Sequence, residues 1–280
     1  PDGLNDQLLS GLEPKGVPEG LRGSVLPFHY NNIDELEVIV KETKGNLAAI
    51  IMEPIHGEEP EDDFLQKVRD IATHEKAVLV FDEISIGFKQ TFGGAHLLYN
   101  VNPDLAVFSK GMSNGYAMAA IIGTKSAMEA AQNTFISSTY WTESIGPSAA
   151  LATIKKMKRK DVSSHLVRIG KKANDGLLSY AKKHGIKIKT GGPVTMGFFS
   201  FDYGEESNSV RTLFTQEMLS RGILASSRFY PSFAHTEKHL KLYFNALDEV
   251  FVFLAESIKT GAVHENLRGP VAHSGFRRLN

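Results

Sequence analysis

The sequence has no cysteine, which excludes disulfide bonds and thiolate metal sites and favours a cytoplasmic location. It also lacks an apolar run close to the roughly 20 residues that cross a bilayer, so no membrane partner is expected. Neither sign of charge dominates, since 31 Lys and Arg accompany 32 Asp and Glu. The basic excess of nucleic-acid-binding proteins is therefore absent, and no nucleic-acid partner is expected. The histidines are scattered along the chain, and no metal site is expected.

The N-terminus lacks an initiator methionine and the pattern of a signal peptide. We therefore expect the chain to be part of a longer protein from which N-terminal sequence is missing. Its 280 residues are enough for one large and one smaller domain, and its 42% hydrophobic content is enough for a sizeable core.

Apolar runs alternate with amphipathic stretches through the first two-thirds of the chain. The apolar runs predict buried strands at 47–52, 77–81, 106–108 and 118–122. The amphipathic stretches predict helices at 33–44, 62–75, 147–159 and 162–184. This alternation is typical of right-handed βαβ units, so we predict an α/β fold with a mainly parallel sheet and helices on both faces.

The pattern changes after the helix predicted at 162–184. Short strands are predicted at 186–189, 196–201 and 223–225, and helices at 210–221 and 237–259. We expect residues 1–165 to be part of a large ligand-binding domain, and residues 166–280 to form a small C-terminal α/β domain with a polar tail.

Acids and a lysine follow the predicted strands of the first sheet. They are Glu53 after the first strand, Asp82 and Glu83 after the second, and Ser109 and Lys110 after the third. Ligands of such sheets bind at the carboxyl ends of the strands, so these side chains are candidates for a site. The ordinary alternatives are a helix cap or a solvated surface group.

Lys110 lies between an apolar strand and a glycine-containing loop. From this position we expect the side chain to be partly buried. Burial removes hydration from the charged amine, which lowers the pKa of the lysine and makes its amine nucleophilic. A nucleophilic amine is what a Schiff base with an aldehyde requires.

The strand ends carry an ordered set of motifs. Residues 48–55 contain an apolar strand followed by Glu-Pro, and residues 78–88 contain Asp82-Glu83 followed by Gly-Phe. Gly93-Gly94, Pro103-Asp104 and Ser109-Lys110-Gly111 come after them. The order and spacing of this set resemble the class III, glutamate-1-semialdehyde aminotransferase-like enzymes that use pyridoxal phosphate (PLP). The resemblance implies the type I PLP-dependent transferase fold, with residues 1–165 belonging to the PLP-binding domain.

The resemblance also implies roles for single residues. Asp82 matches the aspartate that pairs with the pyridinium nitrogen, and Ile84 matches an apolar residue under the ring that could equally be ordinary core. Lys110 matches the catalytic lysine that binds the cofactor as a Schiff base. Glu53, Glu83 and Ser109 would support the site without touching the cofactor.

Thr139 matches a threonine that binds the cofactor phosphate of the neighbouring subunit, which implies a homodimer with shared active sites. Its surroundings depart from the family's pattern at Ser138, Glu143 and Ser144, and a turn or helix-capping threonine is the alternative. The family's small-residue phosphate loop and its Tyr-His-Gly motif are not found in the sequence. We expect both to belong to the missing N-terminal portion.

Arg228 follows a predicted strand of the smaller domain and is a candidate partner for a substrate carboxylate, although a surface arginine is equally plausible. The predicted function is transfer of an amino group between a small amine or amino-acid donor and a carbonyl acceptor. A glutamate-1-semialdehyde 2,1-aminomutase is an alternative, but the stretch 228–233 lacks the Glu-Ala-Gly-Phe-like sequence expected there. A truncated, non-catalytic remnant of the fold is the other alternative.

Overall fold

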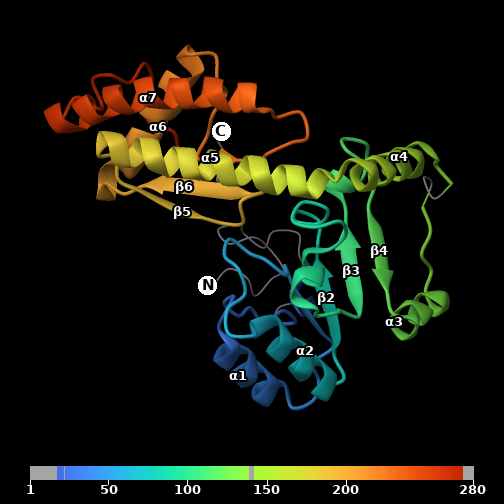
Figure 1. Ribbon diagram of the computed structural model, residues 1–280. Coiled ribbons are helices and arrows are strands. Elements are labelled where there is room, and N and C mark those ends of the chain that lie inside the picture. Colours follow the sequence, from blue (N-terminus) through green and yellow to red (C-terminus); the bar gives the residue numbers. More distant parts are fainter. Residues whose placement is uncertain (1–17, 22, 139–141, 274–280) are drawn as a thin grey trace.

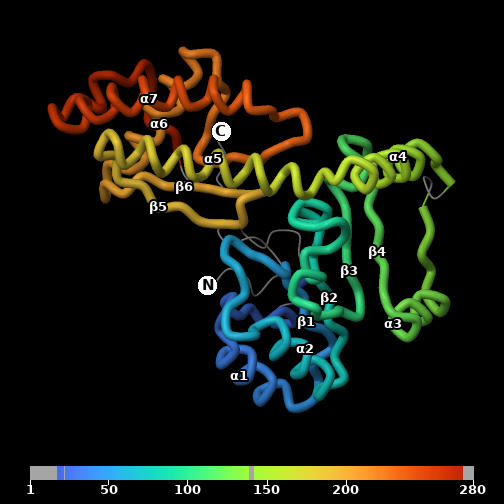
Figure 2. The backbone as a smooth tube through the Cα atoms, in the orientation of Figure 1, coloured from blue at the N-terminus to red at the C-terminus, as the bar shows by residue number. Residues whose placement is uncertain are grey.

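The computed structural model describes residues 18–21, 23–138 and 142–273. Two sheets lie at different ends of the molecule, and a long helix runs from one toward the other (Figures 1 and 2). The described residues contain no helix with both the length and the apolar composition that a bilayer crossing needs.

The first sheet contains β1 (Ala49–Met52), β2 (Val78–Asp82), β3 (Leu105–Phe108) and β4 (Ala120–Gly123), in that order across the sheet. The pairs β1–β2 and β2–β3 are parallel, which confirms the mainly parallel sheet. Strand β4 runs antiparallel to β3. No crossover helix separates these two strands, so the chain turns back directly.

Helices α1 (Ile33–Thr43) and α2 (Phe64–His74) cover one face of this sheet. The Asn32 side chain caps α1 by accepting from the Glu35 amide. Alternate strand residues, Ile50, Leu79 and Phe81, are buried with apolar residues of both helices.

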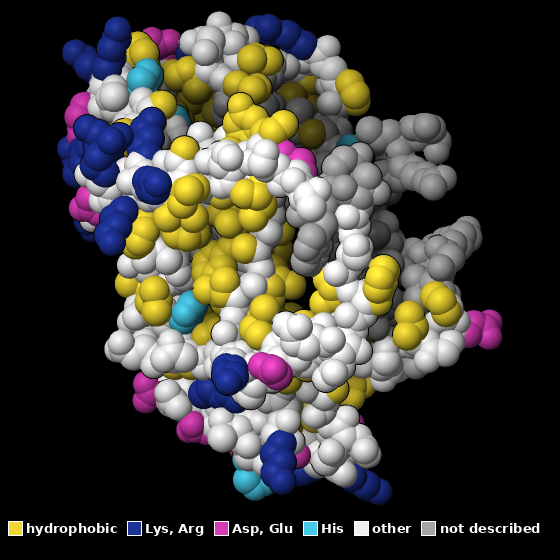
Figure 3. All heavy atoms as spheres, turned by 90° about the vertical axis from the view of Figure 1, so that its right-hand side faces the viewer, with side chains coloured by type: hydrophobic (Ala, Val, Ile, Leu, Met, Phe, Trp, Pro, Cys, Tyr) yellow, Lys and Arg dark blue, Asp and Glu magenta, His cyan; other side chains and the backbone are white. Residues whose placement is uncertain are grey.

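The opposite face of the first sheet is open in the described part of the chain. Ile51 on β1 is 66% exposed, and Ile121 on β4 is 57% exposed. Hydrophobic side chains gather in a hollow on the side of the molecule where α3, α4 and β4 lie (Figure 3). Helices were predicted on both faces of the sheet, and the described residues place helices on one of them.

Helices α3 (Lys125–Glu129), α4 (Ile145–Lys160) and α5 (Val162–His184) follow β4. Asp161 breaks the run between α4 and α5 with a left-handed backbone, φ 45°. Within α5, a Cβ on Gly170 would come within 2.0 Å of the Val194 carbonyl oxygen. Glycine at this position therefore lets the loop at residues 192–196 pack tightly against the helix.

The second sheet is antiparallel and contains β5 (Ile188–Gly191), β6 (Gly197–Phe201) and β7 (Arg228–Phe229). Helices α6 (Ser207–Ser220) and α7 (Glu237–Thr260) pack with it around a core that includes Leu213, Phe214 and Phe251. The strand predicted at 223–225 is wrong, because the only strand of this region is β7 among the residues described. Leu224 is 88% exposed, so that apolar run is not a core strand.

Short 3₁₀ helices complete the described elements: η1 (Glu19–Leu21), η2 (Ala95–Tyr99), η3 (Lys110–Met112), η4 (Ala130–Asn133) and η5 (Gly204–Glu206).

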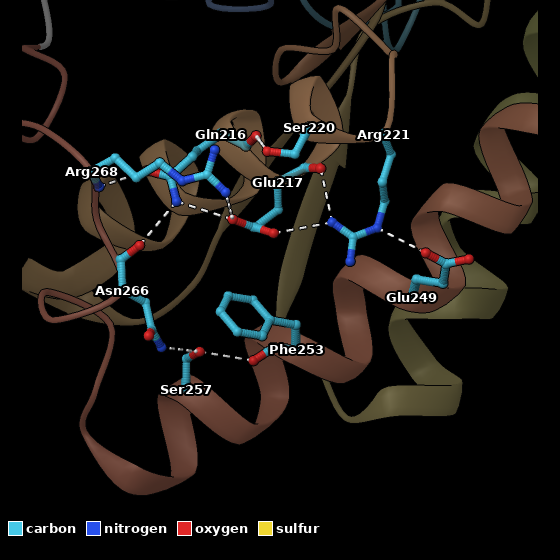
Figure 4. Close-up of polar contacts among 9 residues, drawn as sticks. All are labelled: Gln216, Glu217, Ser220, Arg221, Glu249, Phe253, Ser257, Asn266 and Arg268. Carbon is cyan, nitrogen blue, oxygen red and sulfur yellow. Dashed lines mark hydrogen bonds and ion pairs between the residues drawn. The ribbon is translucent and has the colours of Figure 1, made fainter.

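A polar cluster fastens the C-terminal segment to α6 and α7 (Figure 4). Arg221 donates to Glu217 at 3.0 Å and to Glu249 at 2.9 Å. Gln216 donates to the carbonyl of Asn266 at 2.9 Å. Burial opposes ionisation of Glu217, but hydrogen bonds from Gln216 and Arg221 outweigh it and lower the pKa of this carboxyl group.

Candidate functional site

Lys110 lies just beyond β3, in the first position of η3. Its backbone is left-handed, with φ 44°, a conformation that costs energy for a residue with a side chain. The Nζ atom donates to the Ser85 hydroxyl at 2.6 Å. The expected partial burial is not observed, because the side chain is exposed. It is held by a hydrogen bond across the sheet edge instead of by surrounding apolar groups.

The turn after β2 brings Asp82 and Ser85 to the same edge as Lys110. Asp82 Oδ1 accepts from the Ile84 amide at 2.8 Å, so this carboxylate closes a local turn and does not cap a helix. Asp82 pairs in register with Val107 on the neighbouring strand. Both Asp82 and Ile84 are half-buried. The structure therefore brings an amine, a hydroxyl and a carboxylate to adjacent strand ends.

Glu83 faces inward, and its residue is 1% exposed. Oε2 accepts from the Ala95 amide at 2.8 Å. Oε1 accepts from the His96 amide at 3.1 Å and contacts His96 Nδ1 at 2.7 Å. A Cβ on Gly94 would come within 2.7 Å of this carboxylate. Glu83 thus fixes the turn into η2 behind the site.

Ser109 and Glu53 have separate local roles. The Ser109 hydroxyl donates to the Met118 carbonyl at 2.8 Å and so ties the end of β3 to the segment before β4. Glu53 follows β1 and pairs with His56. These two residues line a cavity of about 400 Å³ together with Tyr30. The described contacts of Glu53 are with His56 and not with Lys110.

Arg228 belongs to β7 and donates from Nη1 to the Tyr230 hydroxyl at 2.9 Å. The Nζ of Lys89 lies over the Tyr230 ring, 5.3 Å from its centroid. Burial, followed by the positive charge of Lys110, lowers the pKa of Lys89. Lys89 thus links the segment that carries Arg228 to the surroundings of Lys110. Thr139 lies outside the described residues.

The sequence profile described as aminotransferase class-III matches residues 27–251, more than half of the chain. The chain belongs to the class-III aminotransferase family. The 3-aminobutyryl-CoA aminotransferase of Cloacimonas acidaminovorans is 31% identical over 84% of the chain and 59% of its own length. The glutamate-1-semialdehyde 2,1-aminomutase of Caldicellulosiruptor saccharolyticus is also 31% identical, over 83% of the chain and 59% of its own length.

Solved structures show the same fold. The FumI protein of Sphingopyxis sp. MTA144, in its PLP internal aldimine form, superposes with a TM-score of 0.79 at 23% identity, over 88% of this chain and 61% of FumI. An omega-transaminase from Sphaerobacter thermophilus gives 0.76 at 19% identity, over 86% of this chain and 60% of that one. The predicted fold class is thereby confirmed. The chain spans about 59% of the length of the curated relatives named above.

Within this class-III aminotransferase chain, five residues at or around the site were not singled out from the sequence. Ser85 lies inside the motif at 78–88, but nothing marked its hydroxyl as the partner of Lys110. Lys89 and Tyr230 meet from positions far apart in the sequence. His235 and His239 stand four positions apart, a metal-ligand spacing, yet each Nδ1 accepts from a backbone amide. Among these five residues, only the spacing between His235 and His239 could have been noticed in the sequence. In the structure it corresponds to hydrogen bonds with backbone amides and not to metal ligands.

Proposed function

We propose that the protein transfers an amino group between an amine or amino-acid donor and a carbonyl acceptor, with PLP as cofactor and Lys110 as the cofactor lysine. The observation that carries the proposal is the meeting of Lys110 Nζ with the Asp82–Ser85 turn at one sheet edge, 2.6 Å from Ser85 Oγ. An amine beside a carboxylate is the donor set that PLP needs at its aldehyde and at its ring nitrogen. Membership of the class-III aminotransferase family supports the same assignment.

When bound, PLP supplies an aldehyde that links to amines and a ring that withdraws electrons. Asp82 would hold the proton on the ring nitrogen by its negative charge, and Ile84 would contact the ring face. The Lys110 amine would carry a proton between the substrate α-carbon and the cofactor atom that accepts it. Ser85 Oγ would orient Nζ through its hydrogen bond. Arg228 would bind a substrate carboxylate through its guanidinium.

The assembly is part of the proposal. A homodimer with shared active sites follows from the resemblance of Thr139 to a phosphate-binding threonine of the neighbouring subunit. Domain boundaries near residue 165, with a large domain before it and a small one after it, are likewise proposed. The separate cores around Phe81 and Phe214 support this division. A cytoplasmic location, expected from the cysteine-free sequence, completes the proposal.

An aminomutase is the second candidate, and one observation favours it: a relative of that name is 31% identical to the chain. The described loop from Arg228 to Phe233 differs from the Glu-Ala-Gly-Phe-like stretch expected of an aminomutase. Amino-group transfer between two molecules therefore remains the leading proposal. A remnant without turnover is the third candidate, since the chain spans about 59% of its curated relatives.

The test is chemical capture of the lysine. The chain is incubated with excess PLP, reduced with borohydride, digested and mapped by mass spectrometry. We expect the stable adduct on Lys110, and an absorbance band in the visible before reduction. Lys110→Ala should lose both signals. Lys89→Arg is the matched control, since it leaves the reacting amine in place, and it should keep both. An adduct on another lysine with Lys110 unmodified would overturn the assignment.

A further inference from the structure

The segment from Arg228 to Thr236 consists of β7 and its connection to α7, and it borders the proposed site. Arg228 and Tyr230 are joined by a hydrogen bond of 2.9 Å, and Tyr230 lies against Lys89. Pro231 is buried and would lie 3.4 Å from a Cβ on Gly170 of α5. One end of the segment therefore rests beside the site, and its middle rests on α5.

Three histidines fasten the other end of this segment. His235 Nδ1 accepts from the Ser232 amide at 2.9 Å, and His239 Nδ1 accepts from the Thr236 amide at 3.1 Å. His165 on α5 reaches across and bonds the His235 carbonyl oxygen from Nε2 at 3.0 Å. The His235 amide returns a bond to the Ser232 carbonyl at 3.0 Å. Ser232 and His235 thus close a small reciprocal ring.

These bonds fix which form of His235 the closed segment can hold. A backbone amide can only donate, so Nδ1 of His235 must carry a lone pair and its proton must sit on Nε2. Protonation would place an N–H on Nδ1 facing the N–H of Ser232. The Ser232 amide would then lose its acceptor, which breaks one of the two bonds of the ring. The new N–H would turn to the Ser232 hydroxyl oxygen, which lies 3.1 Å from Nδ1. By the same argument, the Thr236 amide can donate to His239 Nδ1 only while His239 is neutral.

The charges packed around the segment come from four elements and from the loop after β2. They are Lys89 in that loop, Lys156 on α4, His165, Arg168 and Lys172 on α5, Arg228 on β7, and Glu237 and His239 on α7. Glu237, the one acid of this group, is held by Arg168 at 2.6 Å and Lys172 at 2.7 Å. The negative charge of Glu237 is therefore paired with two cations of α5. Burial, followed by the charges of His239 and His165, lowers the pKa of His235.

We propose that neutral His235 is a positioning residue that holds the 228–236 segment closed, with Arg228 and Tyr230 beside Lys89, and that protonation of His235 releases the segment. The importance of this device for catalysis rests on the proposed function. The device itself does not, because it is built entirely from contacts within the chain.

The direction of the pH dependence follows from linkage. The closed segment lowers the pKa of His235 below the value of about 6.5 that an exposed histidine has. The open segment therefore binds more protons than the closed one. Closure is fully present above about pH 6.5 and is lost as the pH falls through the pKa of the closed state. Within that window the opening constant rises up to about tenfold per pH unit, as one proton requires.

Hydrogen exchange of the Ser232 amide tests the proposal directly. The chain is exchanged at several pH values from about 8 to about 5.5, and each rate is corrected for the intrinsic effect of pH. We expect the protection of Ser232 to fall by up to about tenfold per pH unit in the acid window. The Phe214 amide, in the core of α6, should keep its protection and so exclude global unfolding.

Three variants separate positioning from a merely structural role. In His235→Asn the side-chain oxygen can accept from Ser232 without titrating, so protection should persist while its pH dependence disappears. In His235→Ala protection should be low at every pH. His74→Asn changes an exposed histidine that contacts Glu75, and it should leave the wild-type profile unchanged. A flat wild-type profile, or an unchanged slope in His235→Asn, would overturn the proposal. Neither cofactor nor substrate enters this experiment, so its failure would leave the proposed amino-group transfer untouched.

Discussion

At the scale of single residues, the site depends on how its ionisable groups are held. Asp82 ends β2 and Lys110 comes just after the neighbouring parallel strand β3, and both positions were readable from the apolar runs before them. Their contacts were not readable, because the Ser85–Lys110 bond joins two loops that only the sheet brings together. The contact between Lys89 and Tyr230 was not predictable for the same reason, since it joins segments more than a hundred positions apart.

Asp82 offers the sharpest test at this scale. Asp82→Asn keeps the shape of the side chain and an acceptor for the Ile84 amide, but it removes the negative charge. We expect turnover of the full-length protein to fall by roughly a hundredfold or more, as loss of one preorganised electrostatic contact implies. Steady-state kinetics would measure it. Asp70→Asn, on the exposed surface of α2, is the control and should keep its turnover. Wild-type turnover in Asp82→Asn would remove the ring-nitrogen role.

Glu83 affects stability more than chemistry. Glu83→Gln would set an amide donor against the Ala95 and His96 amides that the carboxylate now accepts. We expect a loss of about 3 kcal/mol in the free energy of unfolding, as for a buried charged acceptor whose partners are left unpaired. Urea unfolding followed by circular dichroism would measure it. Glu37→Gln, at an exposed ion pair, should change stability by less than about 1 kcal/mol. Equal effects in the two variants would contradict the structural role.

At the scale of elements, α5 and α7 are joined by two acidic contacts. Glu237 near the start of α7 binds Arg168 and Lys172, and Asp248 binds Lys183 at 2.7 Å and His184 at 2.5 Å. The two helices therefore run in the same direction, as Figure 1 also shows. A hydrogen bond from Lys183, then one from His184, lowers the pKa of Asp248.

The stability that Asp248 contributes therefore depends on pH. Because its folded pKa lies below the unfolded value, the contribution is full above about pH 4 and disappears as the pH falls through the folded pKa. We expect Asp248→Asn to lower the melting temperature above about pH 4, and to differ less from wild type as the pH approaches 2.5. Thermal unfolding across this range would measure the difference. Asp175→Asn, at an exposed pair, should show no difference at any pH. A difference that is constant down to the lowest pH would count against this account.

The elements were largely predictable because their signals are local. Amphipathic stretches marked the helices, and continuous apolar runs marked the buried strands. The direction of β4 was not predictable, since strand pairing is decided by partners elsewhere in the chain. The strand expected at 223–225 failed because an apolar run marks a strand only if a sheet covers it, and Leu224 is exposed.

At the scale of the whole molecule, we expect a dimer that binds PLP weakly and has no turnover as residues 1–280 alone. The resemblance places the phosphate between Thr139 of one subunit and a small-residue loop that is not in the sequence. One threonine cannot replace the amides of a helix N-terminus, which normally anchor phosphate. Light scattering would give the mass, and a fluorescence titration would give the affinity for PLP. A monomer would remove the shared-site proposal, and tight binding with full activity would show that the loop is dispensable.

The open strand β4 has a consequence for handling the chain. It ends the described sheet, and Ile121 and Ile122 on it are 57% and 56% exposed. An uncovered, β-branched edge is a template on which a strand of another chain can add. The net charge of −1 supplies little repulsion between molecules. We therefore expect the folded chain to precipitate at high concentration. Ile121→Lys should raise the fraction of the protein that stays in the supernatant after centrifugation.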